Sequence, residues 1–207
     1  MDERPLLVKL DGKTAHFKDG SKQDVDAIIL CTGYQHHFPF LEEKLRLKTR
    51  NRLNPPGLYK GVFWENNPKL MYLGMQDQFY TFSMFDAQAW LARDYVLGRI
   101  KLPSRAKMEK ETAAWVAREE KLKNPTEQID FQTDYMKDLV KDIDYPKVDL
   151  DDCAVMFKQW EHYKEESIIA YRDHAFHSPC NGTQAPVHHT PWLQAMDDSM
   201  KDFLRKG

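Results

Sequence analysis

The spacing of apolar residues divides the chain into a first part with strand-like patterns and a later part with helical ones. Up to about residue 73 the apolar residues form short runs, and from about residue 82 they recur every three or four positions. Short runs bounded by turn residues are typical of strands, whereas the wider spacing places residues on one face of a helix. The pattern therefore predicts the α/β class, with a short β-rich start followed by a mainly α-helical region.

A β-hairpin is predicted at the beginning of the chain. The segments 6–10 and 14–17 flank Asp11-Gly12, a dipeptide that favours a tight turn between two strands. Asp19-Gly20 turns the chain again. The pattern therefore predicts a small meander that leads into the next segment.

A strand buried on both faces is predicted at 27–31. Its apolar residues run without alternation from Ala27 to Leu30 and continue into Cys31-Thr32-Gly33-Tyr34. A glycine at the end of such a run indicates that the backbone closely approaches another group. In open α/β sheets dinucleotides bind beyond the carboxyl ends of the strands, so this position is a candidate cofactor contact. Two further short strands are predicted at 62–64 and 70–73.

The first predicted helix begins near residue 82 and ends at Gly98. Ser83 with Asp86 three residues later resembles a capping box, and Gly98 is suited to a helix C-terminus. The apolar residues predicted to share one face of this helix are Phe82, Phe85, Ala89, Ala92 and Val96. Free backbone N–H groups around Thr81–Phe85 favour negative charge at the beginning of this helix.

Three more helices are predicted after the first one along the chain. Pro103-Ser104 begins a charged helix that reaches roughly Lys123, and Asn124-Pro125 starts the next one. Asp149 caps a fourth helix, which is predicted to run to about Tyr171.

The last part of the chain is predicted to be an irregular tail at 174–193, closed by a short helix at about 193–204. The tail holds side chains of the types that bind zinc: His174, His177, Cys180, His188 and His189. However, His-x-x-His-x-x-Cys is not a standard finger spacing, and no Cys-x-x-Cys accompanies it. A zinc-binding module therefore stays an alternative interpretation that the spacing does not favour.

Composition narrows the class of protein. Hydrophobic residues make up 42% of the chain and supply a core, and the net charge of −2 does not favour nucleic acid or membrane partners. No apolar stretch reaches membrane-spanning length. Three widely spaced cysteines favour a reducing compartment, so a cytoplasmic location is expected.

Several segments together resemble the late region of flavin-containing monooxygenases. Cys31–Tyr34 is similar to the Ala-Thr-Gly-Tyr strand of flavin-dependent monooxygenases, with cysteine in place of alanine. Three further segments continue the resemblance: 58–63, 68–74 and Ala87-Gln88-Ala89. The stretch Tyr72–Ala89 is closer still to the bacterial branch, the trimethylamine monooxygenases. The order of elements fits that branch from about residue 5 to 175.

The resemblance implies a two-dinucleotide-domain flavoprotein, of which this chain forms the C-terminal part. Residues 1–53 would be the end of the NADPH-binding domain with the Cys-Thr-Gly-Tyr strand. Residues 54–100 would be the C-terminal strands and helix of the FAD-binding domain. Residues 101–207 would form a helical C-terminal region with the irregular tail.

The glycine-rich turns of such an enzyme are not found in this sequence. None of the nine glycines forms Gly-x-Gly-x-x-Gly or Gly-x-Ser-x-Ser, the turns that hold the pyrophosphates of FAD and NADPH. Both turns would lie upstream, so the missing N-terminal half of the enzyme is an expected partner. The chain alone is expected to bind neither cofactor tightly and to be inactive.

The activity implied by the resemblance is an NADPH- and FAD-dependent monooxygenation. NADPH would reduce FAD, oxygen would add to give a C4a-hydroperoxyflavin, and a soft nucleophile would take the distal oxygen. The small-molecule substrate would be a tertiary amine such as trimethylamine, a sulfide or indole. A homodimer is an assembly that the resemblance allows.

The resemblance points to five cofactor-binding residues and to no catalytic side chain or metal ligand. Gln78 and Thr81 carry amide and hydroxyl groups suited to hydrogen bonds with the flavin edge, and Phe79 is suited to packing on the flavin or the substrate. Thr32 lies in the strand expected to contact the nicotinamide nucleotide. Arg172 is the cation expected to hold the 2′-phosphate of NADPH, since a planar guanidinium binds phosphate bidentately.

Structural roles for the same residues stay open. Gln78 and Thr81 could only cap the helix, Phe79 could only fill the core, and Arg172 could only complement the dipole at a helix end. For the chain as a whole, a non-catalytic helical interaction module is a further alternative.

Overall fold

The computed structural model describes residues 4–33, 35–168, 170–179 and 181–184, and the chain divides into two units. Unit 1 ends at Arg46 and unit 2 begins at Leu47. Strands come first and helices later in the chain, so the predicted order of a short β-rich start and a mainly helical region is confirmed. Over these described ranges, every helix is too short or too polar to cross a membrane.

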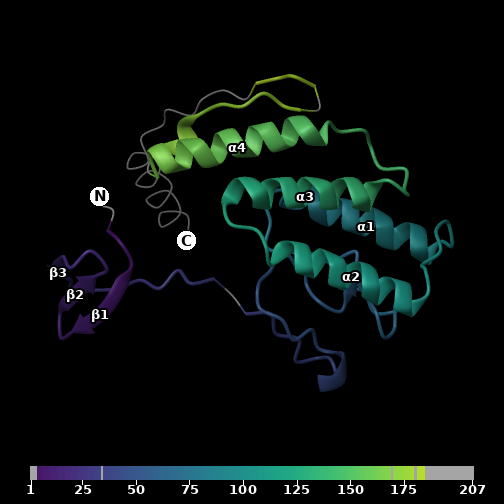
Figure 1. Ribbon diagram of the computed structural model, residues 1–207, viewed down its shortest axis with the longest axis horizontal. Helices are drawn as coiled ribbons and strands as arrows, with labels where there is room; N and C mark the ends of the chain where they lie inside the picture. Colours follow the sequence, from purple (N-terminus) through teal and green to yellow (C-terminus); the bar gives the residue numbers. More distant parts are fainter. Residues whose placement is uncertain (1–3, 34, 169, 180, 185–207) are drawn as a thin grey trace, which may run out of the picture. The chain divides into compact units, whose positions relative to one another are not determined.

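Unit 1 contains an antiparallel meander of three strands in its described part (Figure 1). The strands are β1 (Leu7–Asp11), β2 (Thr14–Phe17) and β3 (Lys22–Asp24), in that spatial order. Asp11 pairs with Thr14 across the first turn, so the predicted hairpin is confirmed. Gly12 has a φ of 58°, a left-handed conformation that glycine adopts without strain.

The predicted buried strand at 27–31 is wrong in this structure. Residues 27–33 form no regular element and are exposed, with Ile29 86% and Leu30 77% exposed. A strand buried on both faces needs neighbouring strands and a packed layer on each face. The described part of unit 1 provides the β1–β2–β3 meander and one short 3-10 helix, and it leaves the apolar run exposed.

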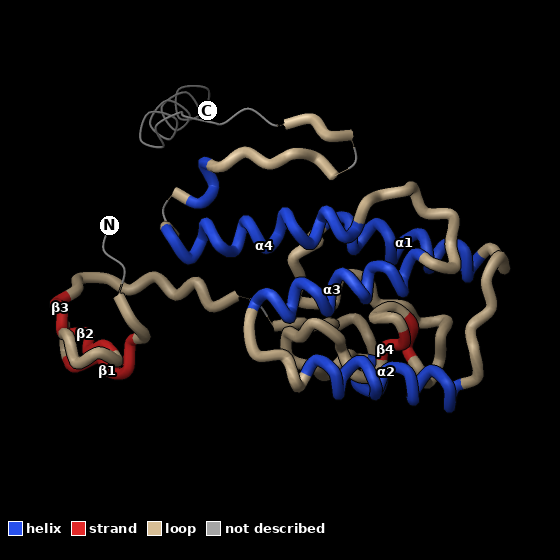
Figure 2. The backbone as a smooth tube through the Cα atoms, turned by 45° about the horizontal axis from the view of Figure 1, so that its top comes forward, coloured by secondary structure: helices blue, strands red, loops and turns tan. Residues whose placement is uncertain are grey.

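Unit 2 combines a short hairpin with four helices in its described part. The strands β4 (Leu58–Tyr59) and β5 (Phe63–Trp64) pair antiparallel. The helices are α1 (Phe82–Val96), α2 (Arg105–Glu119), α3 (Pro125–Val140) and α4 (Leu150–Glu166). The helix α3 lies between α2 and α4 in both views (Figures 1 and 2) and also contacts α1. Two short 3-10 helices, η1 (Glu43–Leu45) in unit 1 and η2 (Tyr171–Asp173) in unit 2, complete the described elements.

Two of the strand predictions in unit 2 differ in outcome. The segment predicted at 62–64 is a strand, β5. The segment predicted at 70–73 makes only an isolated bridge between Met71 and Phe63. The N–H of Tyr72 still donates to the carbonyl of Val62 over 2.9 Å, so the segment lies beside the hairpin without forming a regular ladder.

The face that α1 buries differs from the one that the apolar spacing indicates. Phe82, Ala89 and Val96 are exposed, with Phe82 83% exposed. The residues that α1 buries are Met84, Ala87, Gln88, Leu91 and Asp94. The spacing of apolar residues therefore did not identify the face of α1 that packs inward. The structure instead buries a face that carries a glutamine and an aspartate, both of which find partners inside unit 2.

The predicted helix boundaries are correct at several caps and wrong at others. The side chain of Asn124 accepts the N–H of Glu127, and that of Asp149 accepts the N–H groups of Asp151 and Asp152. The capping box at Ser83 is wrong, because the helix has already begun at Phe82. The second and fourth helices end earlier than predicted, at Glu119 and Glu166. The helix predicted at 193–204 lies outside the described residues.

A buried polar network joins the hairpin loop to α1 and α3. The Gln88 side chain accepts the N–H of Gly74 over 2.8 Å and donates to the hydroxyl of Tyr135 over 2.9 Å. Tyr135 in turn donates to the carbonyl of Lys60 over 2.8 Å. Burial raises the pKa of Tyr135 to about 12, so its hydroxyl stays protonated and able to donate at neutral pH. Gly61 is required beside this network, since a Cβ there would meet the Gln76 amide at 2.2 Å.

Candidate functional site

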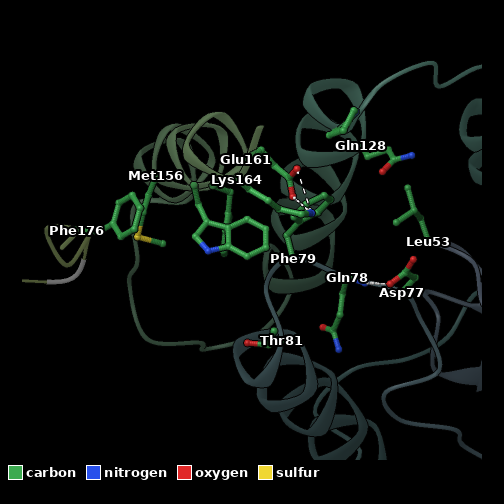
Figure 3. Close-up of a pocket in the computed structure, with 13 residues that line it drawn as sticks. Leu53, Asp77, Gln78, Phe79, Thr81, Gln128, Met156, Glu161, Lys164 and Phe176 are labelled. Carbon is green, nitrogen blue, oxygen red and sulfur yellow. Dashed lines mark hydrogen bonds and ion pairs between the residues drawn. The ribbon is translucent and has the colours of Figure 1, made fainter. Parts of the chain in front are cut away.

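A cavity of about 570 Å³ lies in unit 2, lined by the segment 77–81, the beginning of α3 and the second half of α4 (Figure 3). The polar side chains in its lining are Asp77, Gln78, Thr81, Gln128, Glu161 and Lys164. Its aromatic side chains are Phe79, Phe157, Trp160 and Phe176. The cavity is therefore mainly apolar with a few polar groups, which is typical of small-molecule sites.

The aromatic wall comes from two parts of the chain. Phe79 and Phe157 lie with their ring centroids 6.2 Å apart, and Trp160 continues the wall one turn along α4. Lys164 lies with its ammonium group 5.0 Å from the centre of the Trp160 ring and pairs with Glu161 at 3.2 Å. In Figure 3 the Glu161–Lys164 pair is drawn beside Phe79. This wall offers flat apolar surface to a ligand and keeps its charged groups paired with each other.

Gln78 presents an unsatisfied hydrogen-bond acceptor. Its Oε1 atom is buried and has no hydrogen-bond partner among the described residues. The backbone N–H of Gln78 donates to the Asp77 carboxylate over 3.0 Å. A buried carbonyl oxygen without a donor is costly, so its presence in a cavity wall points to a ligand that donates an N–H or O–H group.

Thr81 holds a strained backbone at the beginning of α1. It is the N-cap residue with φ 45° and ψ −121°, a combination that favours glycine. Within the described part of the chain its side chain makes no capping hydrogen bond. Helix capping therefore does not account for the threonine hydroxyl. Such strain persists only where the surroundings hold it, and it clusters at functional sites.

Side chains of α3 hold the segment 77–80 by hydrogen bonds. The N–H of Phe79 donates to the Gln132 side chain over 2.7 Å, and the Gln132 amide donates to the carbonyl of Asp77. The hydroxyls of Tyr80 and Thr133 lie 2.8 Å apart and hydrogen-bond. Sequence reasoning missed Gln132 and Thr133. The available signal was a glutamine at helical spacing from Ile129, Met136 and Leu139, on the face of α3 that is otherwise apolar.

The structure brings three of the five predicted site residues together. Gln78, Phe79 and Thr81 line the same cavity, as does Trp160. Arg172 lies on η2, is exposed, and has its guanidinium 5.1 Å from the ring of Tyr171. It is not in the cavity lining. Thr32 is exposed in unit 1.

The zinc alternative finds no support in the described part of the chain. There, no group of three histidine, cysteine, aspartate or glutamate side chains could hold a metal ion. His174 instead stacks on Tyr163 with ring centroids 3.6 Å apart. Cys180, His188 and His189 lie outside the described residues.

Comparison with known proteins decides the family. The model of the flavin-binding monooxygenase-like family matches residues 2–154 of this chain. The chain belongs to the flavin-binding monooxygenase-like family. This result confirms the resemblance inferred from the segments 31–34 and 72–89.

Individual relatives of the family are similar over the whole chain. A trimethylamine monooxygenase of Pelagibacter sp. (strain HTCC7211) is 60% identical over 206 residues, which is 100% of this chain and 46% of the relative. One from Methylocella silvestris is 60% identical over 98% of this chain and 45% of the relative. The crystal structure of Tmm from Pelagibacter sp. strain HTCC7211 superimposes with a TM-score of 0.85 at 61% identity. It covers 95% of this chain and 45% of that one. The chain thus spans slightly under half the length of the relatives that it matches.

Proposed function

We propose that this chain is the C-terminal part of an NADPH- and FAD-dependent monooxygenase that oxygenates soft nucleophiles, with trimethylamine as the first candidate substrate. The observation that carries the proposal is the 60% identity, over the full chain, to proteins named trimethylamine monooxygenase. The other half of the same enzyme would complete the site. A sulfide or indole would be an alternative substrate of the same chemical class.

The residues in the cavity fit a flavin. The unpartnered Oε1 of Gln78 would accept a hydrogen bond from an N–H group of the ring system, and Phe79 would pack against its face. The N-terminus of α1, with Thr81, would favour the negative charge of the reduced flavin. When bound, the flavin supplies the electrons and the position at which oxygen is activated.

The chain's own contribution would be to shape a dry site for a small amine. The aromatic rings of Phe79, Phe157 and Trp160 offer apolar contacts to methyl groups and exclude water from the reacting atoms. The carboxylate of Asp77, at the opposite end of the cavity from Phe176 in Figure 3, gives the site one polar edge. Exclusion of water would favour transfer of oxygen to the amine over its loss as peroxide.

Gln78 and Thr81 are tested in the full-length enzyme by alanine variants. We expect Gln78→Ala and Thr81→Ala to lose bound FAD on gel filtration or to release more hydrogen peroxide per NADPH consumed, since hydrogen bonds to the flavin edge are removed. Gln159→Ala, an exposed glutamine on α4, is the matched control and should behave as wild type. Unchanged FAD retention and coupling in both site variants would contradict these assignments. A wild-type enzyme that does not oxygenate trimethylamine would contradict the proposed substrate.

Arg172 is tested by comparing the two nicotinamide nucleotides. If its guanidinium holds the 2′-phosphate, Arg172→Ala should weaken NADPH but not NADH, by about 1.5–3 kcal/mol for a charge-assisted hydrogen bond. If Arg172 is only a surface cation, KM for both nucleotides should change equally. Thr32→Val, which removes a hydroxyl and keeps the shape, tests the other proposed nucleotide contact. It should raise KM for both nucleotides without changing the preference between them.

A further inference from the structure

The cavity segment 77–79 is fastened to α3 by one side chain. Gln132 is fully buried, accepts the N–H of Phe79 over 2.7 Å, and donates to the carbonyl of Asp77. A primary amide is the side-chain group that carries both a neutral acceptor and N–H donors in one plane. It therefore pairs with a backbone donor and a backbone acceptor of the same segment at once.

The backbone held by Gln132 carries the groups that face the cavity. Gln78 lies between the two residues that Gln132 binds, and Gln78 Oε1 is the unpartnered buried acceptor of the site. Three residues after Gln78 the backbone of Thr81 is strained, with φ 45°. Strain of this kind needs contacts on both sides to maintain it. The bond between Tyr80 and Thr133 attaches the residue that follows this segment to α3 as well.

We propose that Gln132 is a positioning residue, which sets the orientation of Gln78 and Phe79 in the cavity wall without itself lining the cavity. This inference rests on the proposed monooxygenase function of that cavity. A misplacement of about 1 Å in a reactive site can lower turnover by up to about a hundredfold. Loss of the two hydrogen bonds that Gln132 makes should therefore lower kcat while unit 2 stays folded.

Two variants of matching shape separate the two hydrogen bonds. Gln132→Met keeps the length of the side chain and removes both bonds. Gln132→Glu keeps the acceptor for the Phe79 N–H and, when ionised, removes the donor to Asp77. Gln159→Glu makes the same chemical change at an exposed position of α4 and is the control.

The first readout is amide hydrogen exchange of the 207-residue chain, which needs no cofactor. We expect the Phe79 amide to exchange at least about tenfold faster in Gln132→Met than in wild type, because its acceptor is gone. Amides in the middle of α2 should keep their protection, which shows that unit 2 is folded. Wild-type exchange at Phe79 in a folded variant would overturn the inference.

The second readout is steady-state kinetics of the full-length enzyme with trimethylamine. We expect kcat to fall by about tenfold or more in Gln132→Met and by less in Gln132→Glu, with smaller changes in KM for NADPH. Equal kcat for wild type and both variants would overturn the positioning role. A wild-type enzyme that is inactive on trimethylamine would instead contradict the proposed function. The exchange result would still decide whether Gln132 holds the segment 77–79. If Gln132→Met does not fold, Gln132→Glu decides the positioning role through kcat, because it keeps the acceptor for the Phe79 N–H and removes only the donor to Asp77. A wild-type kcat in that variant would overturn the inference.

Discussion

The apolar run of unit 1 and the hairpin of unit 2 are both short and rich in apolar residues, but their environments are opposite. In unit 1, Ile29 and Leu30 are 86% and 77% exposed. In unit 2, Leu58 and Phe63 are fully buried. The two segments differ in what surrounds them, because the hairpin packs beneath helices of its own unit whereas the run at 27–30 has no such cover there.

Polar residues show the converse behaviour. Gln88 and Gln132 are fully buried in unit 2, while Phe82 on the same helix as Gln88 is exposed. The glutamines are tolerated inside because each finds backbone partners, which removes most of the cost of burying an amide. Burial in unit 2 therefore depends on the availability of hydrogen-bond partners as well as on residue type.

The strongest test of this comparison makes the same substitution in both units. Leu91 is 1% exposed and Leu30 is 77% exposed. We expect Leu91→Ala to lower the free energy of unfolding of unit 2 by about 2–5 kcal/mol, since it leaves a cavity in a packed core. Leu30→Ala should change the stability of unit 1 by less than about 0.5 kcal/mol. Urea unfolding followed by helical circular dichroism measures the first, and hydrogen exchange of the β2 amides measures the second. Similar losses in the two variants would contradict the difference in burial.

Breaking a largely buried ion pair of unit 2 should have the next largest effect on the free energy of unfolding. The Lys60 ammonium donates to the Asp138 carboxylate over 2.8 Å, and the Lys60 side chain is 9% exposed. Asp138→Asn should cost about 1.5–3 kcal/mol, because the largely buried Lys60 ammonium loses its charged partner and keeps the backbone carbonyl of Asp138 at 2.6 Å. The ion pair between Lys9 and Asp11 is exposed and provides the control. Asp11→Asn should cost less than about 1 kcal/mol.

The Asp138 carboxylate should also affect how the free energy of unfolding changes at acid pH. Burial alone would raise the pKa of Asp138, but hydrogen bonds from Lys141 and Lys60 outweigh it and hold the pKa below its ordinary value of 3.8. Its contribution is therefore present above that value and is lost as the pH falls through the lowered pKa of the folded state. Unfolding free energies measured from pH 6 down to pH 3 should fall less steeply for Asp138→Asn than for wild type. Parallel curves would show that Asp138 is not stabilised as an anion.

Two helix beginnings that look alike in sequence should respond differently to alanine. Asn124 accepts the Glu127 N–H over 2.9 Å, whereas Ser104 caps α2 without a side-chain hydrogen bond within the described residues. Asn124→Ala should cost about 1 kcal/mol and Ser104→Ala only a few tenths. Thermal unfolding of the two variants side by side measures the difference. A larger loss for Ser104→Ala would contradict the capping geometry.

The smallest expected change in stability belongs to the exposed run. Ile29→Ser should leave the free energy of unfolding within about 0.5 kcal/mol of wild type, because the side chain is already in water. It should, however, reduce self-association of the 207-residue chain, since exposed apolar patches promote contacts between molecules. Light scattering against concentration detects that effect, with Lys22→Ser on the exposed β3 as the control. Equal scattering in wild type and variant would show that the run does not mediate association.

The sequence by itself determined the local elements and the family. The turn at Asp11-Gly12, the caps at Asn124 and Asp149, and the helix end at Gly98 were predictable, because each depends on a few neighbouring residues and their backbone preferences. The stretch 72–89 was sufficient to indicate the flavin-binding monooxygenase-like family. These features need no knowledge of distant contacts.

Only the tertiary structure decided which faces are buried and how the cavity is held. The apolar spacing on α1 places Phe82 and Val96 on one face, yet the helix buries Gln88, whose amide accepts the N–H of Gly74, 14 residues earlier. The sequence of α3 alone could not show that Gln132 positions the cavity wall, since its two hydrogen-bond partners lie in the segment 77–79. Hydrogen bonds between residues distant in sequence satisfy buried polar groups, and a local pattern of apolar residues contains no information about them.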